Sequence, residues 1–330
     1  MSAQVFEASD IPASLWDSTH AHGKAGLPNG KLRLPARLEE AYRQALHDLG
    51  LMAMARNIDD REGGPIGEQG EEGAREHFAK RFSGSCGRIQ LYALDPHQTF
   101  KTTRNALAAL FSAGTIRLLD IPLGAGAGAV SLISAVAQLR AEVQPVFPRL
   151  DLDVQVVGGD HNPHQINIAV RMFAILHPWW LEHGINVTLQ TLEWDVLNDE
   201  STNDLVELWR DGLTGTVIPA IVGANFSGFL GGTIPDDNSR RWIDEAESCL
   251  RQVFAVASAR RATTFWIEPA DKRSLQHFLP KLRNQVFGHF KRIISTDANH
   301  PTSNAFLADP IVGQEGFATR ASGIHLVPVV

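Results

Sequence analysis

The spacing of apolar residues changes at about residue 114. Between Leu38 and Met52 apolar residues recur every three or four positions opposite charged ones, which predicts an amphipathic helix. Similar spacing predicts two further helices, at 74–82 and at 99–111. Beyond residue 114, short apolar runs rich in β-branched residues alternate with helical stretches, as in a parallel sheet covered on both faces.

The second part of the chain is predicted to hold seven strands. They are expected at Ile116–Asp120, Val154–Gly158, Asn186–Leu192, Val217–Gly223, Thr264–Ile267, Lys291–Ser295 and Ile324–Val329. Helices between them are expected at 129–140, 163–177, 203–211, 240–260 and 272–287. This rhythm predicts a doubly wound α/β domain over residues 114–330, with a mostly parallel seven-stranded sheet. A helical region over residues 1–113 is expected to cap the carboxyl edge of that sheet.

Two local signals refine this outline. Residues Asn57–Gly73 are rich in glycine and acidic side chains and cannot bury enough apolar surface to order themselves, so they are predicted to form a loop. Asn162 can cap a helix, and Pro163 suits the first helical position because its missing N–H needs no partner there. The loop after the second strand is therefore predicted to span Gly158–Asn162.

The composition, with 44% hydrophobic and 20% charged residues, is that of an ordinary globular protein. The formal charge of -7 repels phosphate, so a nucleic-acid partner would need a local basic patch and is not favoured.

Cys86 and Cys249 are too few for a disulfide framework or a cysteine metal cluster. The sequence has no signal-peptide pattern and no run that could span a membrane, so we expect a cytoplasmic protein without a membrane partner. Nothing in it indicates an oligomeric state.

The strongest chemical signal follows the first predicted strand, where Asp120 leads into a glycine-rich turn and then a helix. Gly124, Gly126 and Gly128 keep side chains out of this turn, so a ligand can approach the backbone closely. The helix presents free N–H groups at its start. The pattern indicates a bound nucleotide-like molecule, although the same glycines would also suit a tightly packed turn without a ligand.

Carboxylates also follow the next two predicted strands. Asp160, before His161 and Asn162, stands where a carboxylate accepts hydrogen bonds from ribose hydroxyls in dinucleotide and nucleoside sites. Its alternative role is to cap a turn. Asp195 could accept a hydrogen bond from an adenine amino group while Val196 or an aromatic neighbour shields the ring, or it could be a solvated strand end.

In this order the elements resemble the class I S-adenosylmethionine-dependent methyltransferase family over residues 114–330. The resemblance lies in an ordered series: an acid that ends the first strand, a glycine loop, an acid placed to bind the ribose, an acid placed to bind the adenine, and a polar end of the fourth strand. The series as a whole is more specific than any one of its parts. The resemblance implies a Rossmann-like domain that binds S-adenosyl-L-methionine, with Asn225 bordering the methyl group and residues 1–113 contributing to substrate recognition. It implies methyl transfer to an acceptor that the sequence does not identify as RNA, protein or small molecule. The cofactor-binding residues that it implies are Asp120, Pro122, Gly124, Gly126, Gly128, Asp160, His161, Asn162, Asp195, Val196, Asn225 and Phe226.

Two features depart from the family pattern. Pro122 stands where the family loop usually has its first glycine, which removes one N–H and fixes that φ. The segment Glu142–Asp153 lengthens the gap between the glycine loop and the ribose acid.

Asn225 and Glu268 are the candidate catalytic residues. Asn225, with an aromatic residue after it, could orient an amine or a planar acceptor, but the Asn/Asp-Pro-Pro-aromatic motif of amino-methylating members is absent. Methyl transfer needs mainly positioning, and a general base only when the nucleophile carries a proton of high pKa. His161, His164 and Glu268 are available for that role. His161, His164 and Asp160 lack a more distant third or fourth ligand, so no metal site is predicted.

Two alternatives stay open at this stage. An NAD(P)-dependent oxidoreductase also has glycines after its first strand and an acid after its second, with Ala129 at the position of the third glycine. Asp120 and the two closing strands favour the methyltransferase class. The second alternative is a non-catalytic scaffold that keeps the fold and the cofactor, as Pro122 and the lack of a decisive catalytic motif would suggest.

Overall fold

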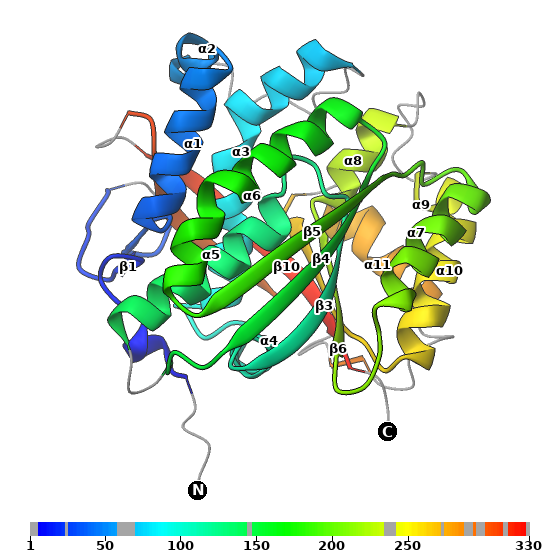
Figure 1. Cartoon of the computed structure of the whole chain (residues 1–330). Helices are drawn as coiled ribbons and strands as arrows, with labels where there is room; N and C mark the ends of the chain where they lie inside the picture. The colour runs from blue at the N-terminus through cyan, green and yellow to red at the C-terminus, as the bar shows by residue number, and fades with distance from the viewer. Residues whose placement is uncertain are drawn as a thin grey trace, which may run out of the picture.

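The computed structural model describes residues 6–23, 26–57, 70–143, 147–233, 242–271, 274–286, 293–294, 301–312 and 316–327. These residues form a ten-stranded sheet flanked by helices (Figure 1). The strands are β1 (Trp16–Asp17), β2 (Lys31–Leu32), β3 (Gly114–Ile121), β4 (Leu152–Asp160), β5 (Ile185–Glu193), β6 (Ile218–Ala224), β7 (Thr263–Pro269), β8 (Ile293–Ile294), β9 (Thr302–Ala308) and β10 (Gly316–Leu326). The α-helices are α1 (Ala36–Asp48), α2 (Met52–Arg56), α3 (Glu71–Leu94), α4 (Lys101–Leu110), α5 (Ala127–Glu142), α6 (Pro163–Glu182), α7 (Asp199–Asp211), α8 (Phe226–Thr233), α9 (Trp242–Glu245), α10 (Glu247–Ala259) and α11 (Leu279–Val286).

Parallel strands make up the centre of the sheet. The sheet order is β1-β2-β9-β10-β7-β6-β3-β4-β5, and β8 pairs with β10 beside this path. The five strands from β7 to β5 run parallel to one another, whereas β10 runs antiparallel to both of its neighbours, β7 and β9. The expected α/β class and mostly parallel sheet are therefore confirmed. The sheet is wider than the predicted seven strands, because β9 was not expected and two short strands of the N-terminal region extend the sheet beyond it.

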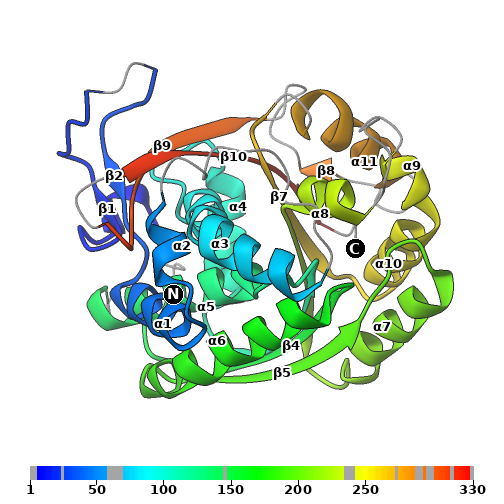
Figure 2. The ribbon, with the colours of Figure 1, turned by 90° about the horizontal axis from the view of Figure 1, so that it is seen from above.

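Alternate residues of the central strands face two separate hydrophobic cores. On β3, Leu118 packs on the side covered by α3, α5 and α6, whereas Leu119 packs on the side covered by α7, α10 and α11. Figure 2 shows these two groups of helices on either side of the sheet. The alternation follows from the pleat of a strand. Burial on both faces explains why the central strands read as nearly continuous apolar runs.

The helix α3 is the largest departure from the predicted helices, because it was expected to span only 74–82. It continues to Leu94 through Gly84 and Gly87, residues with low helix propensity. A Cβ on Gly87 would overlap the side chain of Leu307 on β9, so the glycine allows the helix to pack directly on the sheet. Tertiary packing therefore outweighs the local propensity that predicted an end near Phe82.

The connection after β4 is shorter than the predicted Gly158–Asn162 loop. The strand runs on to Asp160, which leaves two residues before α6 begins at Pro163. As predicted, Asn162 caps this helix, and its Oδ1 accepts a hydrogen bond from the backbone N–H of His164 at 2.9 Å.

The remaining differences concern short elements. The helix α8 was not expected, and the strand expected at Lys291–Ser295 is represented by the two residues of β8. Residues 291, 292 and 295 of that predicted strand lie outside the described residues, as do residues 58–69 of the predicted Asn57–Gly73 loop. The last three residues of that loop, 71–73, belong instead to the first turn of α3. Among the helices that the structure describes, none is long and apolar enough to cross a lipid bilayer.

Candidate functional site at the carboxyl ends of the central strands

The order of the strands places a topological switch point at β3. The chain passes from β3 to β4 and β5 on one side of the sheet, and then returns to β6 on the other side. In open α/β sheets, ligands bind outside the carboxyl ends of the strands at such a point. The predicted site residues all follow or end the central strands at this edge: Asp120, Pro122, Gly124, Gly126 and Gly128 at β3, Asp160, His161 and Asn162 at β4, Asp195 and Val196 after β5, Asn225 and Phe226 at β6, and Glu268 in β7.

The three glycines of the turn after β3 have different structural roles. Gly124 (φ 52°) and Gly126 (φ 85°) adopt left-handed conformations that favour glycine. A Cβ on Gly126 would lie only 3.2 Å from the ring of Phe173, so this glycine packs against α6. A Cβ on Gly124 would meet no atom of the described residues within 4 Å. Of the three positions, Gly124 is the one whose backbone borders open space and is accessible to a ligand.

Gly128 makes room for the side chain of Asp120. A Cβ on Gly128 would overlap Oδ1 of that carboxyl and lie 2.7 Å from its Oδ2. Asp120 is fully buried, and its Oδ2 accepts a hydrogen bond from the backbone N–H of Ala129 at 2.8 Å. Its Oδ1 is buried and has no hydrogen-bond partner among the residues that the structure describes. Burial, reinforced by the nearby charge of Asp160, raises the pKa of Asp120 to about 7. The Asp120 carboxyl therefore packs against the first turn of α5 and accepts a hydrogen bond from it.

Asp160 joins the end of β4 to the glycine turn. Its Oδ2 accepts a hydrogen bond from Gly124 N at 2.8 Å, and its Oδ1 accepts one from Asn162 N at 3.0 Å. The Nδ1 atom of His161 lies 3.7 Å from Oδ1. Burial raises the pKa of this carboxyl, although these bonds and the histidine oppose the effect. Each carboxylate oxygen has a second lone pair, but only 4% of the Asp160 side-chain surface is exposed, so a ligand can reach the carboxyl only at this small surface.

Aromatic rings line the next part of the edge. Phe229 of α8 lies 5.0 Å, between ring centroids, from His161, and it stacks on Trp194 at 5.7 Å with an interplanar angle of 7°. Trp194 and Val196 are fully buried, so neither side chain is free to face a ligand in this conformation. The exposed ring surfaces here belong to His161 and Phe229, which are each partly exposed. Sequence reasoning missed Phe229, whose only signal was its position three residues after Phe226.

Asp195 lies exposed just beyond β5. Its Oδ1 accepts a hydrogen bond from Leu197 N at 2.9 Å, and its backbone N–H donates to Ser201 Oγ at 3.0 Å. The carboxyl therefore caps a turn, which was the alternative interpretation for an acid at a strand end. Its Oδ2 makes none of these bonds and remains available to a ligand.

The tip of β6 is a strained turn held by Glu268. Asn225 has a φ of 58°, a left-handed conformation that asparagine tolerates better than most residues. Glu268 is fully buried and accepts hydrogen bonds from Phe226 N at 2.9 Å, Trp266 Nε1 at 3.0 Å and Ser227 Oγ at 2.7 Å. Burial raises its pKa to about 7. Both oxygens of Glu268 are thus engaged in holding the Asn225 turn.

Arg88 completes the edge from the N-terminal region. This α3 residue donates from Nη1 to Asn225 Oδ1 and from Nε to the backbone oxygen of Arg320 at 3.2 Å. The start of α3 also lies near the glycine turn, because Asn162 Nδ2 donates to Gly70 O at 3.1 Å. Arg88 had no sequence signal, since 137 positions separate it from Asn225. Within the N-terminal region, α3 is thus an element that contacts this edge of the sheet.

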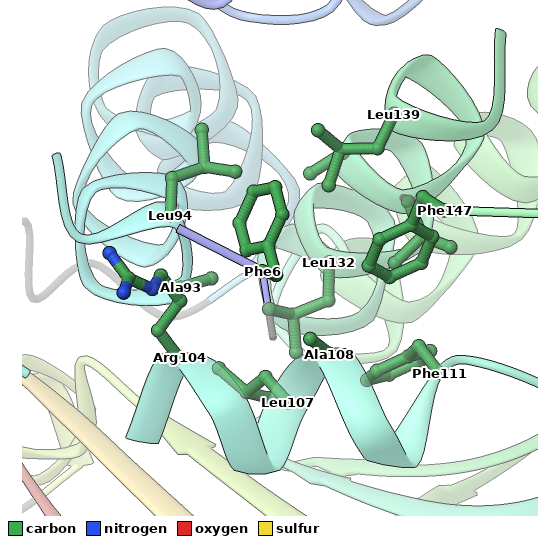
Figure 3. Close-up of a pocket in the computed structure, with 12 residues that line it drawn as sticks. Phe6, Ala93, Leu94, Arg104, Leu107, Ala108, Phe111, Leu132, Leu139 and Phe147 are labelled. Carbon is green, nitrogen blue, oxygen red and sulfur yellow. The ribbon is translucent and has the colours of Figure 1, made fainter. Parts of the chain in front are cut away.

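A small cavity lies elsewhere, between α3, α4 and α5 (Figure 3). Its volume is about 30 Å³. Apolar side chains such as Phe6, Leu132 and Phe147 line it, together with Arg104. Binding sites for small molecules usually measure about 300–1,000 Å³. This cavity is therefore a packing defect rather than a ligand site.

Comparison with known proteins does not assign a family. No protein-family model and no curated protein sequence matches the chain. Within the described ranges, no group of three or more His, Cys, Asp or Glu side chains is placed to hold a metal ion. The functional interpretation therefore depends on the sheet topology and on the geometry of the strand tips.

Proposed function

We propose that the protein is an S-adenosylmethionine-dependent methyltransferase. Two features of the fold support this proposal. The central order β5-β4-β3-β6-β7-β10-β9, with β10 inserted antiparallel, is the strand order of the class I methyltransferases. The glycine turn follows β3, the strand that borders the switch point, which is where that class binds its cofactor.

The observation that carries the proposal is the pairing of Gly124 with Asp160. The backbone of Gly124 borders open space, and its N–H donates to the Asp160 carboxyl at the end of the neighbouring strand. An adenosyl ligand that passes the glycine turn would meet this carboxyl with its ribose hydroxyls. The turn at Gly124 would hold the methionine part, Asp160 the ribose, and Asp195 the adenine amino group, with His161 and Phe229 as the ring surfaces beside the adenine.

The bound cofactor would supply an electrophilic methyl group on a cationic sulfonium. The contribution of the chain is to position the acceptor, because the lone pair of the nucleophile must approach the methyl carbon in line. Asn225 lies at the tip of β6, next to the glycine turn in the sheet, and is the residue best placed to orient the acceptor. Glu268 acts through Asn225 as a positioning residue, since its oxygens already bind the turn.

Calorimetry on the full chain tests this proposal. We expect saturable binding of S-adenosylmethionine and S-adenosylhomocysteine, and no comparable binding of NAD. Tight and selective NAD binding would instead identify an oxidoreductase. If none of the three bound, the cofactor site would be refuted and a scaffold role would be favoured.

A pair of variants tests the role of the carboxylate. Asp160→Ala should weaken S-adenosylhomocysteine binding by about 1 to 3 kcal/mol, because charge-assisted hydrogen bonds to the ribose are lost. The matched control is Asp153→Ala, which removes the same side chain from the exposed opposite end of β4 and should leave the affinity unchanged. Equal affinity of both folded variants would remove Asp160 from the cofactor site.

A further inference from the structure

Arg88 is a half-buried cation with no carboxylate partner among the described residues. Two of its groups are held, because Nη1 donates to Asn225 and Nε to the Arg320 carbonyl. Among the residues that the structure describes, Nη2 has no hydrogen-bond partner and no ion pair reaches the guanidinium. Burial lowers the pKa of Arg88, while the charges of Glu268 and Asp271 oppose that effect from a distance. Desolvating a cation without pairing it is unfavourable, which suggests that a ligand supplies the partner.

Asn225 adds further donors to the same place. Its Oδ1 accepts from Arg88, so its Nδ2 group lies on the opposite side of the amide carbon in the same plane. No described residue accepts a hydrogen bond from that Nδ2. The hydrogen-bonded pair of Arg88 and Asn225 therefore presents N–H groups from two side chains without an acceptor between them. Such a set of donors suits the oxygens of an anion.

The position of the pair places it on the acceptor side of the site. Asn225 follows β6, whereas the carboxyls of Asp160 and Asp195 follow β4 and β5 on the other side of β3. Glu268, the nearest buried acid, has a pKa raised to about 7 and is therefore partly protonated near neutral pH, which weakens its repulsion of an anion. The net charge of -7 disfavours a polyanion, so one acidic group is the better match than a nucleic-acid strand.

We propose that Arg88 and Asn225 bind an oxyanion, a carboxylate or a phosphate group, on the methyl acceptor. This inference rests on the proposed methyltransferase function. The guanidinium would bind the oxyanion through Nη2 and the amide through Nδ2, which fixes the acceptor beside the glycine turn. An acidic substituent on the acceptor would thus be the main determinant of specificity.

The test titrates inorganic phosphate and acetate separately into the full chain labelled with 15N-arginine, and follows the Nε resonances by NMR. We expect a saturable shift of the Arg88 resonance with at least one anion, and the anion that binds more tightly identifies the acidic group. Because the Arg88→Met variant lacks that resonance, its affinity is measured by calorimetry alongside the wild type, and it should be weaker by about tenfold or more, because a charge-assisted hydrogen bond is lost. The matched control, Arg210→Met, removes an exposed arginine of α7 and should not change it.

Two further measurements keep the test decisive. If Arg88→Met does not fold, Asn225→Gly removes the amide donors while it keeps the left-handed backbone accessible, and it should also weaken anion binding. No saturable shift in the wild type, or equal affinity in the folded variants, would overturn the anion site. S-adenosylhomocysteine binding to the wild type without anion binding would refute this inference alone. Anion binding without S-adenosylhomocysteine binding would refute the proposed function and with it the acceptor role of the anion site.

Discussion

Replacing Gly128 with alanine tests the packing beneath the glycine turn. The new Cβ would overlap Oδ1 of Asp120 and lie 2.8 Å from its Cγ. The carboxyl has no space to retreat, because it is fully buried at the end of β3. Either the first turn of α5 or the carboxyl must shift, and the 2.8 Å hydrogen bond from Ala129 N is then strained or lost.

The expected cost follows from these contacts. Overpacking a well-filled core by a methyl group destabilises a protein by about 1–3 kcal/mol. Loss of a hydrogen bond to a charged or partly charged carboxyl adds about 1.5–3 kcal/mol. The higher helix propensity of alanine offsets at most about 1 kcal/mol of this destabilisation. We therefore expect Gly128→Ala to lower the free energy of unfolding by about 2 to 4 kcal/mol, a large part of the stability of a typical domain.

Urea denaturation followed by far-UV circular dichroism measures this change, as a lower midpoint at an unchanged m-value. The matched control is Gly228→Ala, because Gly228 is exposed in α8 and a Cβ there would meet no atom of the described part of the chain within 4 Å. That variant should be neutral or slightly stabilising. The same alanine at position 128 should cost much less in an Asp120→Ala background, since the overlap is then relieved. An equal cost in both backgrounds would refute the proposed clash.

Three other predictions concern charge and backbone. Burial raises the pKa of Asp120 to about 7, so the folded state favours the protonated carboxyl. The stability that this proton contributes is fully present below the pKa of the unfolded state and is lost as the pH rises through 7. Asp120→Asn, which resembles the protonated acid, should therefore gain stability relative to the wild type as the pH rises from about 4 to about 7 in urea titrations, with little further gain above pH 7, and a constant difference over that range would contradict this. Arg140→Met should lower the free energy of unfolding by about 3–5 kcal/mol, because the buried Arg140 donates hydrogen bonds to the carbonyls of Leu150 and Ser112 at 2.6 and 2.9 Å. Its control, Arg171→Met, removes a more exposed arginine and should cost less than about 1 kcal/mol in the same assay. Gly124→Ala should lose about 1 kcal/mol of stability, because alanine is unfavourable at the positive φ of this position. Calorimetry should also show weaker binding of S-adenosylhomocysteine to this variant. Unchanged affinity would place the cofactor away from this turn.

The central strands could be predicted from sequence because they are local signals. The strands β3, β4, β6 and β7 contain short apolar runs that are buried on both faces, which leaves little ambiguity about their type. The edge strand β5 was predicted from the alternation of its apolar and polar residues. The strand β9 was harder, since Ser303 and Asn304 interrupt its apolar pattern and its identity depends on pairing with β10. The helix α3 was shortened in the prediction because the reason for Gly87, its contact with Leu307, lies more than two hundred residues away in the chain.

The candidate site could be predicted only in part for the same reason. The acids and glycines after β3, β4 and β5 were found because they occur at fixed positions relative to the strands. The sequence could not distinguish a glycine that faces a ligand, Gly124, from one that accommodates a neighbouring side chain, Gly128. Nor could it place Arg88 beside Asn225, because that contact exists only when α3 lies across the strand tips.

The pairing of β2 with β9 has a consequence for how the polypeptide matures during translation. Lys31 is aligned with Phe306, and β9 connects to the rest of the sheet only through β10. At synthesis rates of about 5–20 residues per second, β9 leaves the ribosome roughly 15 to 55 s after β2. The buried side chains of Leu32 and its neighbour Leu34 therefore remain without their final surroundings for most of the time that the nascent chain is being made. Shielding of this early segment, by a chaperone or by transient contacts of its own, would be a requirement for productive folding.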